Sequence, residues 1–251
     1  MPKTFDIKGK TALVTGASRG IGKSIVETFL KHGAKKIYAG VRNLKSVSSL
    51  VEKYGDQVVP IQIDMENAET IERAAQRAHD VEIIVNSAGV LNKCSPLDEK
   101  AIEALKFEIN INVFGLMRLA KAFAPVLKAN GGGVFVQLNS VSSIRTSANF
   151  ATYSASKAAA YAITQGLQKD LIKQGTKVIS VHPGPIDTDM AVKAGLKDRA
   201  EPPEVVAEGI IQTMREGQFH LFPDQMAHKI GTAYQSFAKE IIERDMMLTA
   251  D

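Results

Sequence analysis

Short apolar runs alternate with longer amphipathic stretches along the whole chain. The apolar runs are rich in Val, Ile and Leu and predict strands at residues 11–15, 36–41, 58–63, 82–86, 134–139 and 177–182. The amphipathic stretches between them predict helices at about 20–31, 44–54, 67–78, 98–128 and 152–173. The alternation then continues with a helix at 202–217, a short strand at 219–222 and a terminal helix at 225–244.

This alternation predicts the fold class. Strands that are apolar on both faces and alternate with helices are typical of a mostly parallel sheet covered on both sides. Because crossovers between parallel strands are right-handed, the sheet is expected to be doubly wound, in an α/β fold. No linker, repeat or low-complexity tract interrupts the pattern, so residues 1–251 are predicted to form a single domain.

Composition excludes several classes of protein. The chain has 45% hydrophobic and 23% charged residues, as globular proteins do, and no apolar run approaches the roughly 18–20 residues of a membrane helix. The first ten residues carry charges where a signal peptide has its apolar core, so we expect a cytoplasmic protein without membrane contacts. A net charge of +4, evenly spread, does not indicate nucleic-acid binding.

Cysteine and histidine usage indicates neither a disulfide nor a metal site. Cys94 is the single cysteine, so an intrachain disulfide is impossible, and we expect it to lie in a loop without a chemical role. The five histidines show no pair at zinc-ligand spacing, so no metal is expected.

A glycine-rich segment, TGASRGIG at residues 15–22, follows the first predicted strand. A turn of this kind between a strand and a helix lets backbone N–H groups approach a pyrophosphate at the positive end of the helix dipole. Gly22 would let that helix pack closely on the sheet. The spacing G-x-x-x-G-x-G differs from the common G-x-G-x-x-G, and an ordinary connection is the alternative; the position at the first strand–helix junction favours cofactor binding.

The end of the second strand indicates which dinucleotide is bound. NAD sites place Asp or Glu near this point for the ribose 2′-hydroxyl, but residues 38–43 contain no acid. Arg42 follows the strand and Arg19 lies in the glycine-rich turn, and two guanidinium groups can fork onto a 2′-phosphate. The sequence therefore favours NADP(H) over NAD(H). The alternative interpretation is that Arg42 is an ordinary solvated charge in a loop.

Tyr153 and Lys157 are candidate acid–base groups. A spacing of four residues places both on one face of the predicted helix, one turn apart. A phenol with a pKa of about 10 exchanges protons poorly at neutral pH, and a neighbouring ammonium is expected to lower that pKa. A Tyr and a Lys four residues apart occur by chance in many proteins, so other residues are needed to support a catalytic role.

Those other residues are present. The segments 15–22 and Asn86-Ser87-Ala88-Gly89, with Asn112, Ser140, Tyr153, Lys157 and Pro183-Gly184, have the order and spacing of the short-chain dehydrogenase/reductase family, which the chain resembles over about residues 8–190. The resemblance implies a Rossmann-like sheet of seven strands. It further implies a cofactor half at about 8–140 and a catalytic and substrate half at about 140–251.

The resemblance also implies residue roles. Ser140, thirteen residues before Tyr153, would polarise the substrate oxygen, and Tyr153 would donate the proton in reduction. Lys157 would hold the nicotinamide ribose and tune Tyr153, while Asn112 would anchor a water that relays protons. The cofactor-binding set it implies is Gly16, Ser18, Arg19, Gly20, Ile21, Gly22, Arg42, Asp64, Asn86, Ala88, Gly89, Tyr153, Lys157, Pro183, Gly184, Ile186 and Thr188. Within this set, Asp64 would contact the adenine, and Ile186 and Thr188 the carboxamide.

The implied activity is NADP(H)-dependent interconversion of a ketone or aldehyde with an alcohol, by a homodimer or homotetramer. The alternatives are a dinucleotide-binding regulatory protein without catalysis and a sugar-nucleotide epimerase or dehydratase. The glycine spacing and the larger C-terminal domain that are typical of the second class are absent from this chain. Residues 90–96, 142–150 and 190–199 should surround a substrate of apolar character, and no Arg or Lys can be placed against a substrate carboxylate.

The C-terminal segment 217–251 departs from the family. In place of a glycine-rich end it has an apolar stripe at helical spacing, which favours core packing over a substrate lid. The stripe consists of Phe222, Met226, Ile230, Tyr234 and Phe237.

Overall fold

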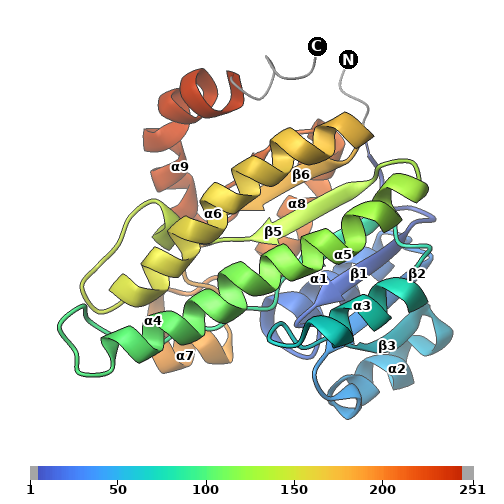
Figure 1. Ribbon diagram of the computed structural model, residues 1–251, viewed down its shortest axis with the longest axis horizontal. Helices are drawn as coiled ribbons and strands as arrows, with labels where there is room; N and C mark the ends of the chain where they lie inside the picture. Colours follow the sequence, from blue (N-terminus) through green and yellow to red (C-terminus); the bar gives the residue numbers. More distant parts are fainter. Residues whose placement is uncertain (1–4, 245–251) are drawn as a thin grey trace.

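A single parallel sheet organises the chain in the computed structural model, which describes residues 5–244 (Figure 1). Within that range seven strands pair in the order β3-β2-β1-β4-β5-β6-β7, with every neighbouring pair parallel. The strands are β1 Thr11–Thr15, β2 Lys36–Val41, β3 Val58–Gln62, β4 Ile83–Asn86, β5 Val134–Leu138, β6 Lys177–Val181 and β7 His220–Leu221. The α/β, doubly wound prediction is thus confirmed.

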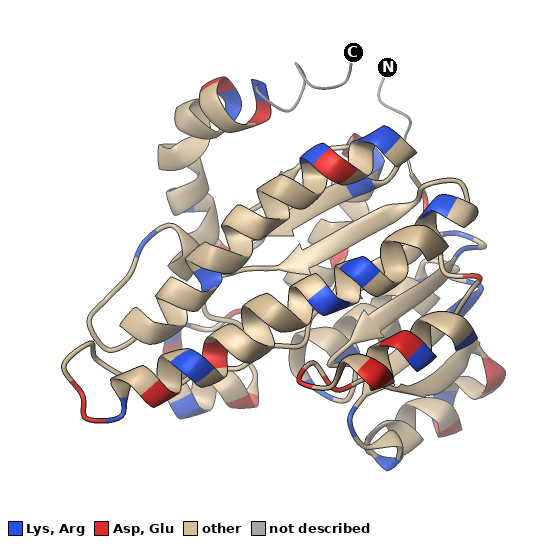
Figure 2. Cartoon of the chain, in the orientation of Figure 1, with Lys and Arg blue, Asp and Glu red and all other residues tan. Residues whose placement is uncertain are grey.

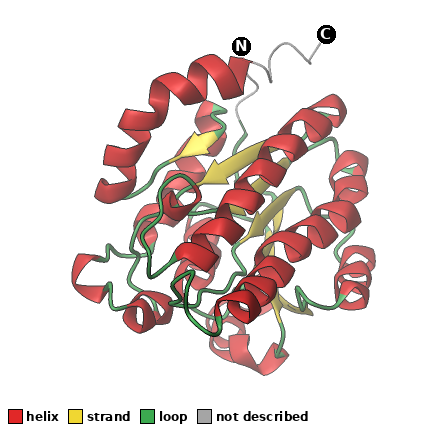
Figure 3. Cartoon of the chain, turned by 60° about the vertical axis from the view of Figure 1, so that its left-hand side comes forward, coloured by secondary structure: helices red, strands yellow, loops and turns green. Residues whose placement is uncertain are grey.

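Helices cover both faces of the sheet. The α-helices are α1 Gly20–Lys31, α2 Ser48–Tyr54, α3 Ala68–Arg77, α4 Ala101–Ile109, α5 Gly115–Ala129, α6 Ala151–Leu171, α7 Asp189–Ala194, α8 Glu204–Glu216 and α9 Gln225–Phe237. Helices α3, α5 and α6 pack on one face, and α1 and α8 on the other (Figure 1). Figure 3 shows α9 beside the short β7 at one edge of the sheet.

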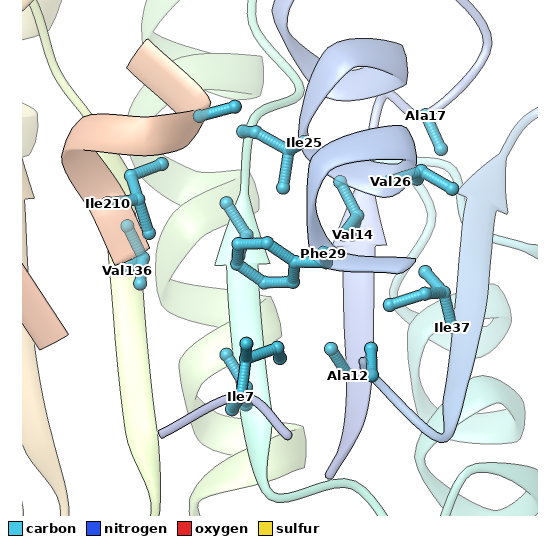
Figure 4. Packing of buried hydrophobic residues seen from close by; sticks show 14 of the residues in the cluster. Ile7, Ala12, Val14, Ala17, Ile25, Val26, Phe29, Ile37, Val136 and Ile210 are labelled. Atoms are coloured by element: carbon cyan, nitrogen blue, oxygen red, sulfur yellow. The ribbon is translucent and has the colours of Figure 1, made fainter. Parts of the chain in front are cut away.

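The packing of α1 illustrates how sequence spacing builds the core. Ile25 and Phe29 are four residues apart, so both side chains leave the same face of the helix. Both are completely buried between the sheet and Ile210 of α8, as Figure 4 shows. Val14 of β1 and Val136 of β5 lie beneath them. Burying an aliphatic or aromatic side chain of this size contributes roughly 1.5–3 kcal/mol, so this layer fixes α1 on the sheet.

Several helices differ from the periodicity-based expectation. The stretch 44–54 begins as a 3₁₀ turn, Leu44–Val47, because the Asn43 side chain accepts the Lys45 N–H. The helix expected at 98–128 starts at residue 101 and contains a π-helical turn, Asn110–Phe114, between α4 and α5. Tertiary contacts accompany that turn, since Gly115 packs directly against Met65. Helix α7 was not expected; Thr188 caps its first turn by accepting the Ala191 N–H.

No helix within residues 5–244 is both long enough and apolar enough to span a bilayer.

Candidate active site

A cavity of about 870 Å³ opens at the carboxyl ends of the parallel strands. The strand order reverses between β1 and β4, and a doubly wound sheet has its binding crevice at that point. The cavity is lined from β1 by Thr15, from β2 by Val41, from β5 by Leu138 and from the segment after β6 by Pro183. The tertiary structure thus brings the two predicted halves of the site into one space.

The glycine-rich turn forms one end of this cavity. Gly16 and Gly20 have φ values of 66° and 52°, a left-handed conformation that strains other residues. A Cβ on Gly22 would lie 2.2 Å from the Gly16 carbonyl oxygen, so only glycine lets α1 begin this close to the turn. Ser18, Arg19 and the three glycines line the cavity, as expected for a phosphate-binding turn.

The Asn86–Gly89 segment is held by Thr15. The Thr15 hydroxyl accepts the N–H groups of Ser87 and Ala88 at 3.1 and 3.0 Å and donates to Asn86 Oδ1 at 2.8 Å. The bond at position 87 uses the backbone N–H, so it does not depend on the Ser87 side chain. Ala88 and Gly89 line the cavity, whereas Asn86 is buried and bonds Gln137 behind it.

Arg42 and Asp64, which follow the second and third strands, both line the cavity. Arg19 lines it too, but its guanidinium is paired with Asp189 of α7 at 2.7 Å. The two arginines expected on one phosphate are therefore both at the cavity, and one of them has a competing carboxylate. Asp189 was not singled out from the sequence, because its partner lies 170 residues away along the chain.

Ser140, Tyr153 and Lys157 meet at the opposite end of the cavity. Ser140 follows β5, and the other two project from the first turns of α6. Tyr153 is 8% and Lys157 5% exposed, and the Lys157 ammonium lies 5.9 Å from the centre of the Tyr153 ring. Lys157 Nζ donates to the Leu138 carbonyl at 2.8 Å. The Ser140 hydroxyl donates to the Pro183 carbonyl at 3.4 Å and accepts the Ser142 N–H at 3.1 Å, and its presence beside the phenol lowers the Tyr153 pKa.

The expected lowering of the Tyr153 pKa by Lys157 is not found in this structure. Burial raises the Tyr153 pKa to about 12, and this outweighs the lowering effect of the Ser140 hydroxyl, while the charge of Glu108 raises it further. Lys157 does not offset the effect, because burial alone lowers its own pKa to about 8 and its ammonium is directed at Leu138. The four-residue spacing predicted that Tyr153 and Lys157 lie close together, but it could not predict how strongly burial desolvates them.

Asn112 lies in the π-helical turn, and both donors of its side-chain amide are in use. Oδ1 accepts the Val90 N–H at 3.0 Å, and Nδ2 donates to the Val90 carbonyl at 3.0 Å and to Ser156 Oγ at 2.9 Å. The side-chain amide therefore joins the loop after β4 to α6. Because an amide oxygen can accept two hydrogen bonds, Oδ1 keeps one acceptor position for the water expected there.

The segment after β6 carries a contact that sequence analysis missed. Asp224, 2% exposed, accepts the Gly184 N–H at 2.6 Å and the Ala227 N–H at 3.0 Å. It thereby caps α9 and holds the Pro183–Gly184 turn at the cavity. An Asp directly before an amphipathic stretch is a helix-capping signal, which could have identified the cap but not the bond to Gly184. Ile186 and Thr188 line the cavity nearby.

The interpretation of the apolar stripe at 222–237 as core packing was wrong for three of its members. Met226 and Ile230 line the cavity, and Phe237 is 52% exposed. Phe222, before the helix, stacks on His182 at 5.0 Å, and Tyr234 packs against the core. A helix at the sheet edge has one face toward the cavity and another toward the core, which helical spacing alone cannot distinguish.

Other lining residues match or extend the expected substrate segments. Apolar side chains on the substrate side come from Leu91, Phe107, Phe150, Met190 and Leu196. Cationic side chains that the sequence could not place also line the cavity, namely Arg145, Lys193 and Arg199. Cys94 is buried outside it. Among residues 5–244, no group of three His, Cys, Asp or Glu side chains is arranged to hold a metal ion.

Known proteins with similar sequences and structures point to one family. The family model described as short chain dehydrogenase matches residues 10–199. An uncharacterized oxidoreductase of Staphylococcus saprophyticus is 31% identical over 221 residues, which are 84% of this chain and 93% of that protein.

Solved structures agree. A short chain dehydrogenase from Burkholderia cenocepacia in complex with NADP is 33% identical, with a TM-score of 0.86 and coverage of 95% of this chain and 99% of that chain. Another, from Burkholderia phymatum in complex with NAD, is 22% identical, with a TM-score of 0.80 and coverage of 96% of both chains, and shows the shared fold.

Proposed function

The chain belongs to the short-chain dehydrogenase family of oxidoreductases, and on that premise we propose that it interconverts an apolar ketone or aldehyde with its alcohol, using NADP(H) and Tyr153. The observation that carries the proposal is the convergence of Tyr153, Ser140 and the glycine-rich turn on one cavity. A dinucleotide held at the turn would share this cavity with the two hydroxyl groups.

The fit of a dinucleotide follows from features of this cavity. Gly16 and Gly20 provide a left-handed turn with exposed N–H groups, and any side chain at Gly22 would collide with that turn. The first turn of α1 starts there, so its positive dipole end faces a pyrophosphate. The same end of the cavity carries Arg42, which supports a 2′-phosphate and hence NADP(H).

In this mechanism the bound nicotinamide supplies or accepts the hydride, and the chain handles the proton. Ser140 donates a hydrogen bond to the carbonyl oxygen and orients it toward Tyr153. Tyr153, kept protonated by its buried position, donates its phenolic proton to the developing alkoxide in reduction. Lys157 holds the ribose of the cofactor.

The walls of the cavity support an apolar substrate. Leu91 and Phe150 come from the two predicted substrate loops, Met190 from α7, and Met226 and Ile230 from α9. These side chains line the same cavity as Ser140 and Tyr153, together with the cationic Arg145, Lys193 and Arg199. A ketone or aldehyde with an apolar body would bury its hydrocarbon surface there and present its oxygen to the hydroxyl pair.

A regulatory, non-catalytic dinucleotide-binding protein is the competing function. Such a protein needs the glycine-rich turn but not the buried hydroxyl pair. Ser140 and Tyr153 both line the cavity together with Lys157, and this favours catalysis.

The deciding experiment is a screen of NADPH oxidation across ketones, aldehydes and quinones, run beside the Tyr153→Phe variant. The proposal expects at least one carbonyl that the wild type reduces and the variant does not. NADPH that binds tightly to both proteins but is never oxidised would support the regulatory alternative instead.

A further inference from the structure

A buried carboxyl lies beneath the substrate-side loop. Glu108 of α4 has no exposed surface and does not line the cavity. Its Oε1 accepts the backbone N–H of Asn92 at 2.7 Å, and its Oε2 is buried without a hydrogen-bond partner. A half-satisfied carboxyl is costly in a protein interior, so its position calls for a function.

Glu108 and Asn112 act on the same loop. They are four residues apart and project from one face of the helix. Asn112 bonds both the N–H and the carbonyl of Val90, and Glu108 accepts the N–H of Asn92 two residues further on. Between these anchor points, Val90 and Leu91 line the substrate side of the cavity. The two side chains together form a clamp on residues 90–92.

The same pair also contacts the helix that carries Tyr153. Asn112 Nδ2 donates to Ser156 Oγ at 2.9 Å. One turn earlier on α6, the Thr152 hydroxyl faces the Glu108 carboxyl closely enough to lower its pKa, yet neither the hydroxyl nor Oε2 completes a hydrogen bond. Thr152 directly precedes Tyr153. Glu108 is therefore placed between the substrate loop and the catalytic turn of α6.

We infer that Glu108 is a positioning residue for the proposed reaction: with Asn112 it fixes residues 90–92 on the substrate side of the cavity. The inference rests on the proposed function for its significance in catalysis. An amide at position 108 can accept the Asn92 N–H in the same way, whereas an aliphatic side chain cannot.

The test compares Glu108→Gln, Glu108→Leu and the control Glu103→Gln in the full chain with NADP⁺ present. Glu103 is on the same helix but is exposed and paired with Lys106. Hydrogen exchange of residues 90–97 reports the clamp. This measurement requires no turnover, so it remains interpretable if the proposed carbonyl reduction fails.

Glu108→Leu should accelerate exchange at residues 90–97 by about tenfold or more, as expected for the loss of one charge-assisted hydrogen bond. Glu108→Gln should keep exchange slow, and Glu103→Gln should not change it.

Unchanged exchange in the Leu variant would overturn the clamp, and exchange in the Gln variant as fast as in the Leu variant would show that acceptance of the Asn92 N–H is not what holds the loop. If the Leu variant does not fold, the smaller Glu108→Ala variant takes its place, and a thermal melt establishes that each variant is folded.

Discussion

The guanidinium of Arg19 lies 2.7 Å from the carboxylate of Asp189, so the glycine-rich turn before α1 is joined to the first residue of α7 at the cavity. The two side chains are 69% and 64% exposed, and exposed ion pairs of this kind contribute only about 0.2–1 kcal/mol. The pair is therefore weak enough for a phosphate to displace the carboxylate. This relationship makes cofactor affinity and the position of α7 interdependent.

Replacing Asp189 by Asn should strengthen NADPH binding. Without its carboxylate partner, Arg19 is free to turn to the 2′-phosphate, so the dissociation constant should fall by up to about fivefold. NADH, which has no such phosphate, should be unaffected. Fluorescence titration of both cofactors at one ionic strength checks this, and weaker NADPH binding by the variant would show that Asp189 helps to hold the cofactor.

Replacing Arg42 by Ala should weaken NADPH binding selectively. Loss of charge-assisted contacts of about 1.5–3 kcal/mol corresponds to roughly a ten- to hundredfold rise in the NADPH dissociation constant. NADH binding should change little. Lys45→Ala is the matched control, because Lys45 is a nearby cation on the 3₁₀ turn that does not line the cavity. Equal losses for NADH and NADPH would place Arg42 away from the phosphate.

Replacing Tyr153 by Phe should abolish turnover and leave cofactor affinity nearly intact. The variant keeps the ring and removes the hydroxyl that transfers the proton, so kcat should fall by at least about a hundredfold. Steady-state kinetics with any carbonyl found in the screen, together with a cofactor titration, measure the two effects. Turnover within about tenfold of the wild type would remove Tyr153 from its role.

Replacing Lys157 by Met should stabilise the protein while abolishing activity. Burial lowers the Lys157 pKa from 10.5 to about 8, so below pH 8 the folded state carries a disfavoured charge. At pH 7 the variant should therefore be more stable by about 1–3 kcal/mol, after allowance for the lost bond to Leu138.

The pH dependence of this gain has a defined sign. Between the folded pKa of about 8 and the unfolded value of 10.5, the unfolded chain binds the proton that the folded chain has lost. Wild-type stability thus rises with pH in that window, and the advantage of Lys157→Met should shrink. Urea unfolding of both proteins, without cofactor, at pH 7 and toward pH 10.5 tests this. A constant difference would mean that Lys157 is not desolvated.

We also propose a homodimer or homotetramer through the surface of α4, α5 and α6. Phe114 and Met117 on this side are 49% and 46% exposed, and charged side chains are sparse along α6 (Figure 2). Exposed apolar side chains gathered in this way are typical of interfaces. Sedimentation should show a species larger than the 27.1 kDa chain, and Phe114→Glu should dissociate it. A 27.1 kDa species for the wild type at micromolar concentration would contradict the assembly.

Local chemistry determined much of this protein from its sequence. The predicted bounds of β1, β2 and α1 match the structure, because apolar periodicity and glycine conformation depend on residues close together in the chain. The motif spacing likewise indicated that Ser140, Tyr153 and Lys157 belong to one site, and all three line one cavity in the structure. The spacing of Tyr153 and Lys157 needs only one turn of helix, which the sequence specifies directly.

Tertiary structure decided the electrostatics and the outer wall of the site. Asp189 meets Arg19 across 170 residues, and the Glu108 charge acts on Tyr153 from a different helix. The Tyr153 pKa rises because packing from several elements removes water, a sum that no local pattern contains. The stripe of α9 divides between cavity and core for the same reason: burial and charge depend on which distant segments fold together.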